Sequence, residues 1–295
     1  MAKLRRALLL ALVALPVAFA LAASTAVGWI ESFDGSPEHY RLVRSGKELP
    51  VSMFLPIHQG DDIAVLQSGR RIRLILDGGR VFEELTQSNS RYVVRQPRRV
   101  PTLPDNLMSW AGSWFTKWHQ ERLTTVSVHV RSDKNISIPL LADRRQMLAI
   151  PAPTLAIAWK GGAPPFSVQV GYDVSARGPL VSAEGLSERR VLLPDLALAP
   201  GRYAVRIADS HGSEAAAPFS VVPRERLPSE PEDIRLTGPD VTHQTLLAAW
   251  LTTVESGEWV FQGYQQAALL AQKYYPAGLL RDAIERGEYP RGSPN

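Results

Sequence analysis

Hydrophobic and polar residues alternate in many short segments of this chain, which is typical of half-buried β-strands. In the segment 71–76, Ile72, Leu74 and Leu76 fall on one face, because successive strand residues point to opposite sides. Segments 126–130 and 166–174 show the same alternation. Clusters of Gly, Pro, Asp and Ser separate these segments at intervals typical of turns. The pattern predicts a mainly β protein with many short strands.

The clearest such block lies in the first third of the chain. A Gly60-Asp61-Asp62 turn precedes an apolar run at 63–66, and the strand 71–76 ends in Asp77-Gly78-Gly79. This order resembles the extracytoplasmic β-domain of FecR-type proteins over residues 26–94. The resemblance implies a small FecR-like β-domain, which we place at 24–100. It also implies a periplasmic accessory or sensor role in signalling, transport or envelope assembly, and it implies no reaction.

A second β-module is expected at 150–223. Phe166, Val168 and Val170 alternate along its longest strand. The run Trp159–Phe166, followed later by Gly201-Arg202-Tyr203, resembles the Ig-like module that accompanies some FecR-domain proteins. The resemblance implies an Ig-like β-sandwich without the inter-sheet disulfide of antibody domains, because the chain has no cysteine. Residues 124–149 read as a β-hairpin that completes one of the two modules.

Residues 101–123 are expected to form a linker and an amphipathic helix that joins the two β-modules. Trp110, Trp114 and Trp118 recur every four residues, and Phe115 widens the same apolar stripe. Each Trp buries roughly 150–250 Å² when it packs, so this face must dock on something. The alternatives are the protein's own β-domains, a partner protein and the membrane interface. These four residues are therefore the candidate interaction face.

The C-terminal part is expected to be helical. Residues 224–240 form a linker of alternating charge for which we expect little fixed structure. Within 241–290 we predict three helices, with Gly257 ending the first and Pro276 ending the second. Their spacing is similar to one and a half tetratricopeptide-like helix pairs. Because a solenoid needs about three repeats, we expect this segment to cap the sandwich or to pack against a partner.

Residues 1–23 are identified as a signal peptide. Lys3, Arg5 and Arg6 precede an apolar run at 7–21 with small residues at its end. We therefore expect a periplasmic or secreted protein, with an uncleaved N-terminal membrane anchor as the alternative. Ser24 stands where a lipoprotein would need Cys, so no lipid anchor is expected. Without the three basic residues, 30 Lys and Arg face 29 acids and the charge falls from +4 to +1, which excludes nucleic acid as an expected partner.

No pattern of catalytic or metal-ligating residues is evident. None of the six histidines falls at a metal-ligand spacing, and nucleotide-binding glycine motifs are missing from the sequence. Asp61, Asp62 and Asp77 are either turn residues or ligands of a Ca²⁺ ion, and turn formation is the commoner role. We therefore expect no enzyme activity, no cofactor and no metal site.

The hypothesis from sequence is a non-catalytic extracytoplasmic binding, scaffold or sensor-accessory protein that contacts an envelope or membrane protein. One alternative is a glycan- or peptidoglycan-binding protein, which would need exposed aromatic side chains such as Trp29, Trp159 and Tyr172. A second alternative is an exported hydrolase, which would need acidic or histidine side chains converging in a cleft.

Overall fold

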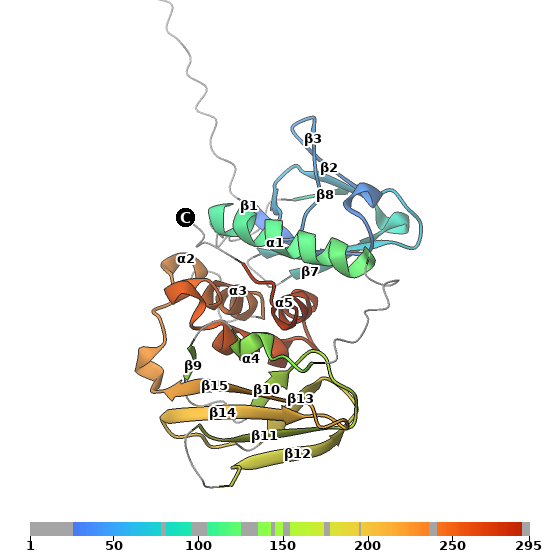
Figure 1. The fold of residues 1–295 in the computed structure, drawn as a ribbon. Coiled ribbons are helices and arrows are strands. Elements are labelled where there is room, and N and C mark those ends of the chain that lie inside the picture. The colour runs from blue at the N-terminus through green and yellow to red at the C-terminus, as the bar shows by residue number, and fades with distance from the viewer. Residues whose placement is uncertain are drawn as a thin grey trace, which may run out of the picture.

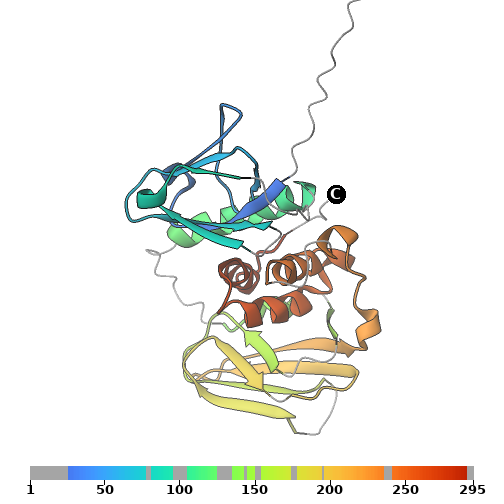
Figure 2. The same ribbon diagram turned by 180° about the vertical axis from the view of Figure 1, so that it is seen from behind.

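A computed structural model describes residues 26–77, 81–95, 105–124, 135–142, 145–149, 154–173, 178–194, 196–235 and 241–290. The predicted signal peptide, residues 96–104 of the predicted linker and the predicted strand at 125–131 lie outside these ranges. Within them, fifteen strands form four sheets and a helical segment follows at the C-terminal end. The predicted mainly β fold class is confirmed. Figure 1 shows the helical segment between the two groups of sheets, and Figure 2 shows the same order from behind.

The N-terminal module consists of two four-stranded sheets, with strand orders β4-β1-β6-β7 and β3-β2-β5-β8. Ile72 and Leu74 are fully buried on one face of β6, as their alternation predicts, while Arg71 and Arg73 are exposed on the other. The strands are β1 (Ala26–Phe33), β2 (Tyr40–Arg44), β3 (Lys47–Leu49), β4 (Pro56–His58), β5 (Asp62–Val65), β6 (Arg71–Leu76), β7 (Val81–Thr86) and β8 (Tyr92–Val93).

The Gly60-Asp61-Asp62 turn is held by a buried carboxylate. Asp61 is fully buried and accepts hydrogen bonds from Arg44 Nε and Nη2 at 2.9 and 2.8 Å. The His58 backbone N–H donates to the same carboxylate at 2.8 Å. Gly60 adopts a φ of 86°, which favours glycine at this turn. Asp61 therefore ties the β4–β5 turn to β2.

The second module is an incomplete sandwich. One sheet has five strands in the order β12-β11-β14-β15-β9, and the facing sheet has only β10 and β13. Tyr203, near the start of β14, donates a hydrogen bond to the Ala199 carbonyl at 2.8 Å, which resembles the tyrosine corner of Ig-like folds. The strands are β9 (Gln146–Ala149), β10 (Thr154–Ala158), β11 (Phe166–Tyr172), β12 (Val181–Leu186), β13 (Arg190–Pro194), β14 (Gly201–Ala208) and β15 (Glu214–Val222).

The predicted hairpin at 124–149 is wrong in its second strand. Only Ser137 bridges to Lys160, and Pro139–Leu141 forms a 3₁₀ turn that buries Leu140 and Leu141. Pro139 lacks the backbone N–H that a central strand position needs, which favours the turn. The strand β9 follows and pairs in parallel with β15, so the end of this segment belongs to the second module.

The three predicted C-terminal helices are confirmed as α3 (Val241–Leu251), α4 (Val260–Leu270) and α5 (Tyr275–Glu285), but the first two end before Gly257 and Pro276, where the sequence placed their ends. Pro276 lies in the first turn of α5, where its missing N–H costs nothing. The expected lack of structure before them is wrong for 224–235, which contains a 3₁₀ turn (Arg224–Arg226) and a short helix α2 (Glu232–Arg235). Ile234 is fully buried and anchors this segment to the core.

Helix α4 closes the open side of the sandwich through glutamine side chains. The Ala149 N–H of edge strand β9 donates to Gln262 Oε1 at 2.9 Å. On β10, the Ala156 N–H donates to Gln265 Oε1 at 2.7 Å, and Gln265 Nε2 donates to the Ala156 carbonyl at 2.9 Å. The helix thus supplies the hydrogen bonds that missing neighbour strands would have made. The expectation that the helical segment caps the sandwich is confirmed.

The close approach of α3 and α4 depends on Gly263. A Cβ at this position would lie 2.5 Å from the Ala248 carbonyl oxygen. We expect Gly263→Ala to lower the free energy of unfolding by about 1–3 kcal/mol, because the backbone must move to relieve the overlap. Gly278→Ala in α5 is the matched control, since its Cβ would lie 3.6 Å from the nearest atom. That variant should gain up to about 1 kcal/mol from helix propensity. Urea titration of both variants checks this, and equal destabilisation would contradict it.

Candidate binding site

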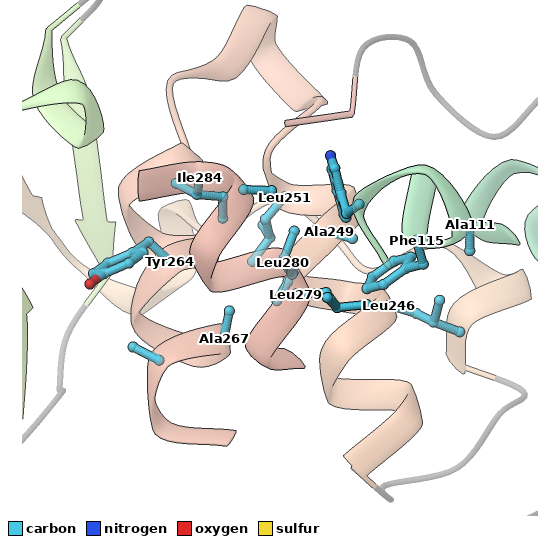
Figure 3. Packing of buried hydrophobic residues seen from close by; sticks show 14 of the residues in the cluster. Ala111, Phe115, Leu246, Ala249, Leu251, Tyr264, Ala267, Leu279, Leu280 and Ile284 are labelled. Carbon is cyan, nitrogen blue, oxygen red and sulfur yellow. The ribbon is translucent and has the colours of Figure 1, made fainter. Parts of the chain in front are cut away.

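The Trp-rich helix α1 (Asp105–Thr124) packs between the N-terminal module and α5. Phe115 and Trp118 are buried, with exposures of 0% and 1%. Phe115 contacts Phe54 edge-on with 5.0 Å between ring centroids, and it belongs to one cluster with Leu246 and Leu279 (Figure 3). Neither side chain is available to a partner, which corrects their place in the candidate interaction face. Of the three alternatives for the Trp-rich face, packing inside the protein accounts for Phe115 and Trp118.

The other two members of the stripe are half-buried. Trp110 and Trp114 pack against the core at its margin. The ring centroid of Trp114 lies 6.0 Å from that of Trp118, and Lys117 Nζ lies 5.7 Å from the Trp114 centroid. Because Trp110 and Trp114 are partly exposed, they are the two members of the candidate interaction face that a partner could still contact.

His119, in the next turn of α1, connects three segments that lie far apart in the sequence. Its Nε2 lies 2.8 Å from the Gly35 carbonyl, and its Nδ1 lies 2.7 Å from the Tyr275 hydroxyl of α5. Because a carbonyl only accepts, Nε2 carries the proton and Nδ1 accepts from Tyr275. The ring is 2% exposed and packs edge-on against Phe33. Burial lowers the pKa of His119, which favours this neutral tautomer.

A cleft of about 460 Å³ opens beside His119. The ends of β1 and β6 form one side, and α1 and the start of α5 form the other. Leu123 lies at the rim and is 45% exposed. The lining residues are Ser32, Phe33, Asp34, Gly35, Arg70, Arg71, Arg73, Glu84, His119, Leu123 and Tyr275. The cleft therefore lies at the junction of the N-terminal module with the helices.

Most charges in this cleft are paired with one another. Arg71 Nε lies 3.1 Å from an Asp34 carboxylate oxygen, and Arg71 Nη1 lies 3.8 Å from Glu84. Arg73 reaches the buried Glu31 at 3.4 Å. Burial raises the pKa of Glu31, and the nearby Arg73 charge opposes that rise. The acidic groups near the cleft are thus engaged by arginines rather than arranged to transfer protons.

The loop that carries Gly35 is fixed by a buried hydroxyl. Tyr40 Oη lies 2.7 Å from both the Asp34 and the Arg71 carbonyls, and the Asp34 N–H donates to it at 2.9 Å. Burial raises the pKa of Tyr40 to about 12. Gly35 has a φ of 75°, and a Cβ there would lie 3.1 Å from Arg70 Cζ. A side chain at this position would therefore meet the guanidinium of Arg70.

Several residues singled out from the sequence lie elsewhere in the fold. Trp29 and Trp159 are buried at 3% and 4% exposure, whereas Tyr172 is 37% exposed and stacks on Tyr203. The Asp61 carboxylate is bonded to Arg44 and is not a free ligand. Among the residues that the structure describes, no group of three or more histidine or acidic side chains could hold a metal ion.

The residues that define the cleft were not predicted from the sequence. His119, Tyr275 and Gly35 meet across separations of 84 and 156 residues. The local signals were an Asp-Gly turn at Gly35 and an arginine pair at 70–71, and both patterns are common in loops.

The fold and the cleft define a class: a two-module, mainly β protein with a helical bridge and a polar cleft at the joint. No protein-family model matches the sequence, and no curated protein matches it. The FecR resemblance stays a prediction.

Several solved structures are similar in part, among them the following two. The crystal structure of CopC from Methylosinus trichosporium OB3b aligns with 29% of this chain and 91% of its own, at 22% identity and a TM-score of 0.23. The BSP domain of a biofilm associated protein aligns with 65% of this chain and 32% of its own, at 11% identity and a TM-score of 0.26. Scores this low carry no argument about fold or function. In the described ranges, no helix has both the length and the hydropathy to span a bilayer.

Because the pKa of His119 is lowered in the folded protein, the free energy of unfolding depends on pH. Below pH ~6.5 the unfolded chain binds a proton that the folded His119 resists. The stability contributed by this group is therefore complete above that pH and is lost as the pH falls toward the lowered folded value. We expect the free energy of unfolding to fall between pH 7.5 and pH 5, and His119→Gln to remove part of that fall. The same substitution at exposed His211 controls for the loss of one imidazole. Identical slopes for wild type and His119→Gln in urea titrations would contradict the assignment.

Proposed function

We propose that this protein is a non-catalytic, extracytoplasmic binding or scaffold protein that contacts another protein of the cell envelope. One observation carries the proposal: the groups in the cleft that resemble catalytic residues already serve internal contacts. Both nitrogens of His119 are hydrogen-bonded, and Asp34 and Glu84 lie against Arg71. A general base needs a free lone pair within reach of a substrate proton. The cleft offers binding chemistry instead.

The extracytoplasmic location rests on the sequence. Three basic residues precede an apolar run at 7–21, and such a segment directs export. The module at 24–100 resembles a FecR-type domain, which supports an accessory or sensor role. We propose that the protein presents its cleft to an envelope or membrane protein from a rigid frame, because buried polar contacts link both β-modules to the helices.

The alternative functions receive less support. A glycan-binding surface would need exposed aromatic rings, and Trp29 and Trp159 are buried. Among the described residues, the exposed aromatic side chains Phe82 and Tyr172 lie on different modules, and no Trp is exposed. A hydrolase would need a histidine or acid free to exchange protons, and the internal contacts of His119 and Asp34 argue against that role.

The proposal predicts site-specific capture of a protein partner. A photo-activatable amino acid at Leu123, on the rim of the cleft, should cross-link one defined envelope protein in cells of the native host. Leu269 on α4 is the matched control, because it is 50% exposed compared with 45% for Leu123 and does not line the cleft. Mass spectrometry identifies the captured protein. Equal capture from both positions, or turnover of an envelope polymer by the purified protein, would contradict the proposal.

A further inference from the structure

We propose that the cleft beside His119 binds a carboxylate on an extended segment of the partner protein, with Arg70 as the principal contact. This inference rests on the proposed function and specifies the chemistry of the partner. It is carried by the position of Arg70, by the pairing of the other two arginines of the cleft and by the exposed apolar side chains at and beside its rim.

Arg70 differs from the other arginines of the cleft. Its Nε donates to Gln67 Oε1 at 3.2 Å, and no carboxylate among the described residues lies within ion-pair distance of it. Its guanidinium lies beside Gly35, because a Cβ at that position would be 3.1 Å from Arg70 Cζ. The hydrogen bond to Gln67 leaves the remaining N–H donors of the guanidinium for a carboxylate.

The ion pairs of the cleft leave Arg70 for an anion. Three arginines line the cleft. Arg71 lies against Asp34 and Glu84, and Arg73 lies against the buried Glu31, so Arg70 is the lining arginine that has no ion pair among the described residues. His119 adds no charge in its neutral form. A planar guanidinium binds a carboxylate through two parallel hydrogen bonds, and this geometry suits an Asp, a Glu or a chain terminus.

The rim of the cleft favours a protein segment over a small free anion. Leu123 at the rim is 45% exposed, and Phe82, which lies on β7 outside the lining, is 57% exposed. Phe82 shares a face of β7 with the lining residue Glu84, because strand residues two apart point the same way. Exposed aromatic and aliphatic side chains next to arginine are typical of protein contact surfaces.

Strand addition to β7 is not the expected mode of binding. β7 is the edge strand of its sheet, but the side-chain amide of Asn89 already bonds to its edge. Asn89 Nδ2 donates to the Glu84 carbonyl at 3.0 Å, and the Thr86 N–H donates to Asn89 Oδ1. A partner segment would therefore bind through its side chains, with a carboxylate at Arg70 and apolar groups against Leu123 and Phe82.

The test uses a fluorescein-labelled hexapeptide of alternating Glu and Val, with the Gln–Val peptide as its uncharged counterpart. Fluorescence anisotropy with the full-length protein at low salt should show binding of the Glu–Val peptide only. Arg70→Gln should weaken this binding about tenfold, the effect of losing one charged hydrogen bond. Arg70→Lys should retain part of it, because Lys keeps the charge without the bidentate geometry. Arg206→Gln, at an exposed position of β14 in the second module, removes the same charge and should leave the affinity unchanged.

Four results would overturn the inference. Equal affinities for wild type and Arg70→Gln would remove Arg70 from the site, provided that urea titration shows both proteins folded. An equal loss in Arg206→Gln would indicate general charge attraction. Complete displacement of the peptide by an equal concentration of inorganic phosphate would assign the cleft to a phosphate group.

Capture of an envelope protein through Leu123 that persists in Arg70→Gln would overturn this site and keep the proposed function. Peptide binding that depends on Arg70, without any captured protein, would support this site and contradict the proposed function.

Discussion

The fold depends on how an incomplete sandwich is closed. The sheet of β10 and β13 cannot cover the five-stranded sheet that it faces, and the edges of β9 and β10 would leave backbone groups unpaired. Unpaired buried amides cost roughly 1–3 kcal/mol each. Helix α4 removes this cost with the side-chain amides of Gln262 and Gln265, and it places Phe261 against Phe219 in the sandwich core. The helical segment is therefore part of the second module.

The same helices hold the two β-modules together. Arg190 of β13 binds the Glu285 carboxylate of α5 through two hydrogen bonds at 2.8 and 2.6 Å, and the Tyr264 hydroxyl donates to the same carboxylate at 3.0 Å. Burial raises the pKa of Tyr264 well above its ordinary value, so it remains a donor. At the other end of α5, Tyr275 reaches His119 on α1. One helix thus links the sandwich to the helix that packs on the N-terminal module.

This arrangement places the cleft where it can serve binding. One side comes from the N-terminal module and the other from α1 and the start of α5, and His119 links the two sides through Gly35 and Tyr275. The Trp-rich helix contributes mainly by its buried side, since Phe115 and Trp118 fill the space between the modules. A partner at the cleft would contact polar groups that are held in place before it arrives, which reduces the entropy lost on binding.

The sequence by itself determined the local structure of this protein. The alternation of Ile72 and Leu74 and the three C-terminal helices follow from interactions between residues a few positions apart, so they were predicted correctly, whereas the helix ends expected at Gly257 and Pro276 were not. Only the tertiary structure decided which elements meet: that β9 joins the second module, that Trp118 is buried, and that the cleft forms around His119. These outcomes depend on contacts between residues separated by 73 to 156 positions, such as Phe219–Gln146 and His119–Tyr275. Periodicity shows that one face of an element is apolar, but it does not show which other element packs against that face.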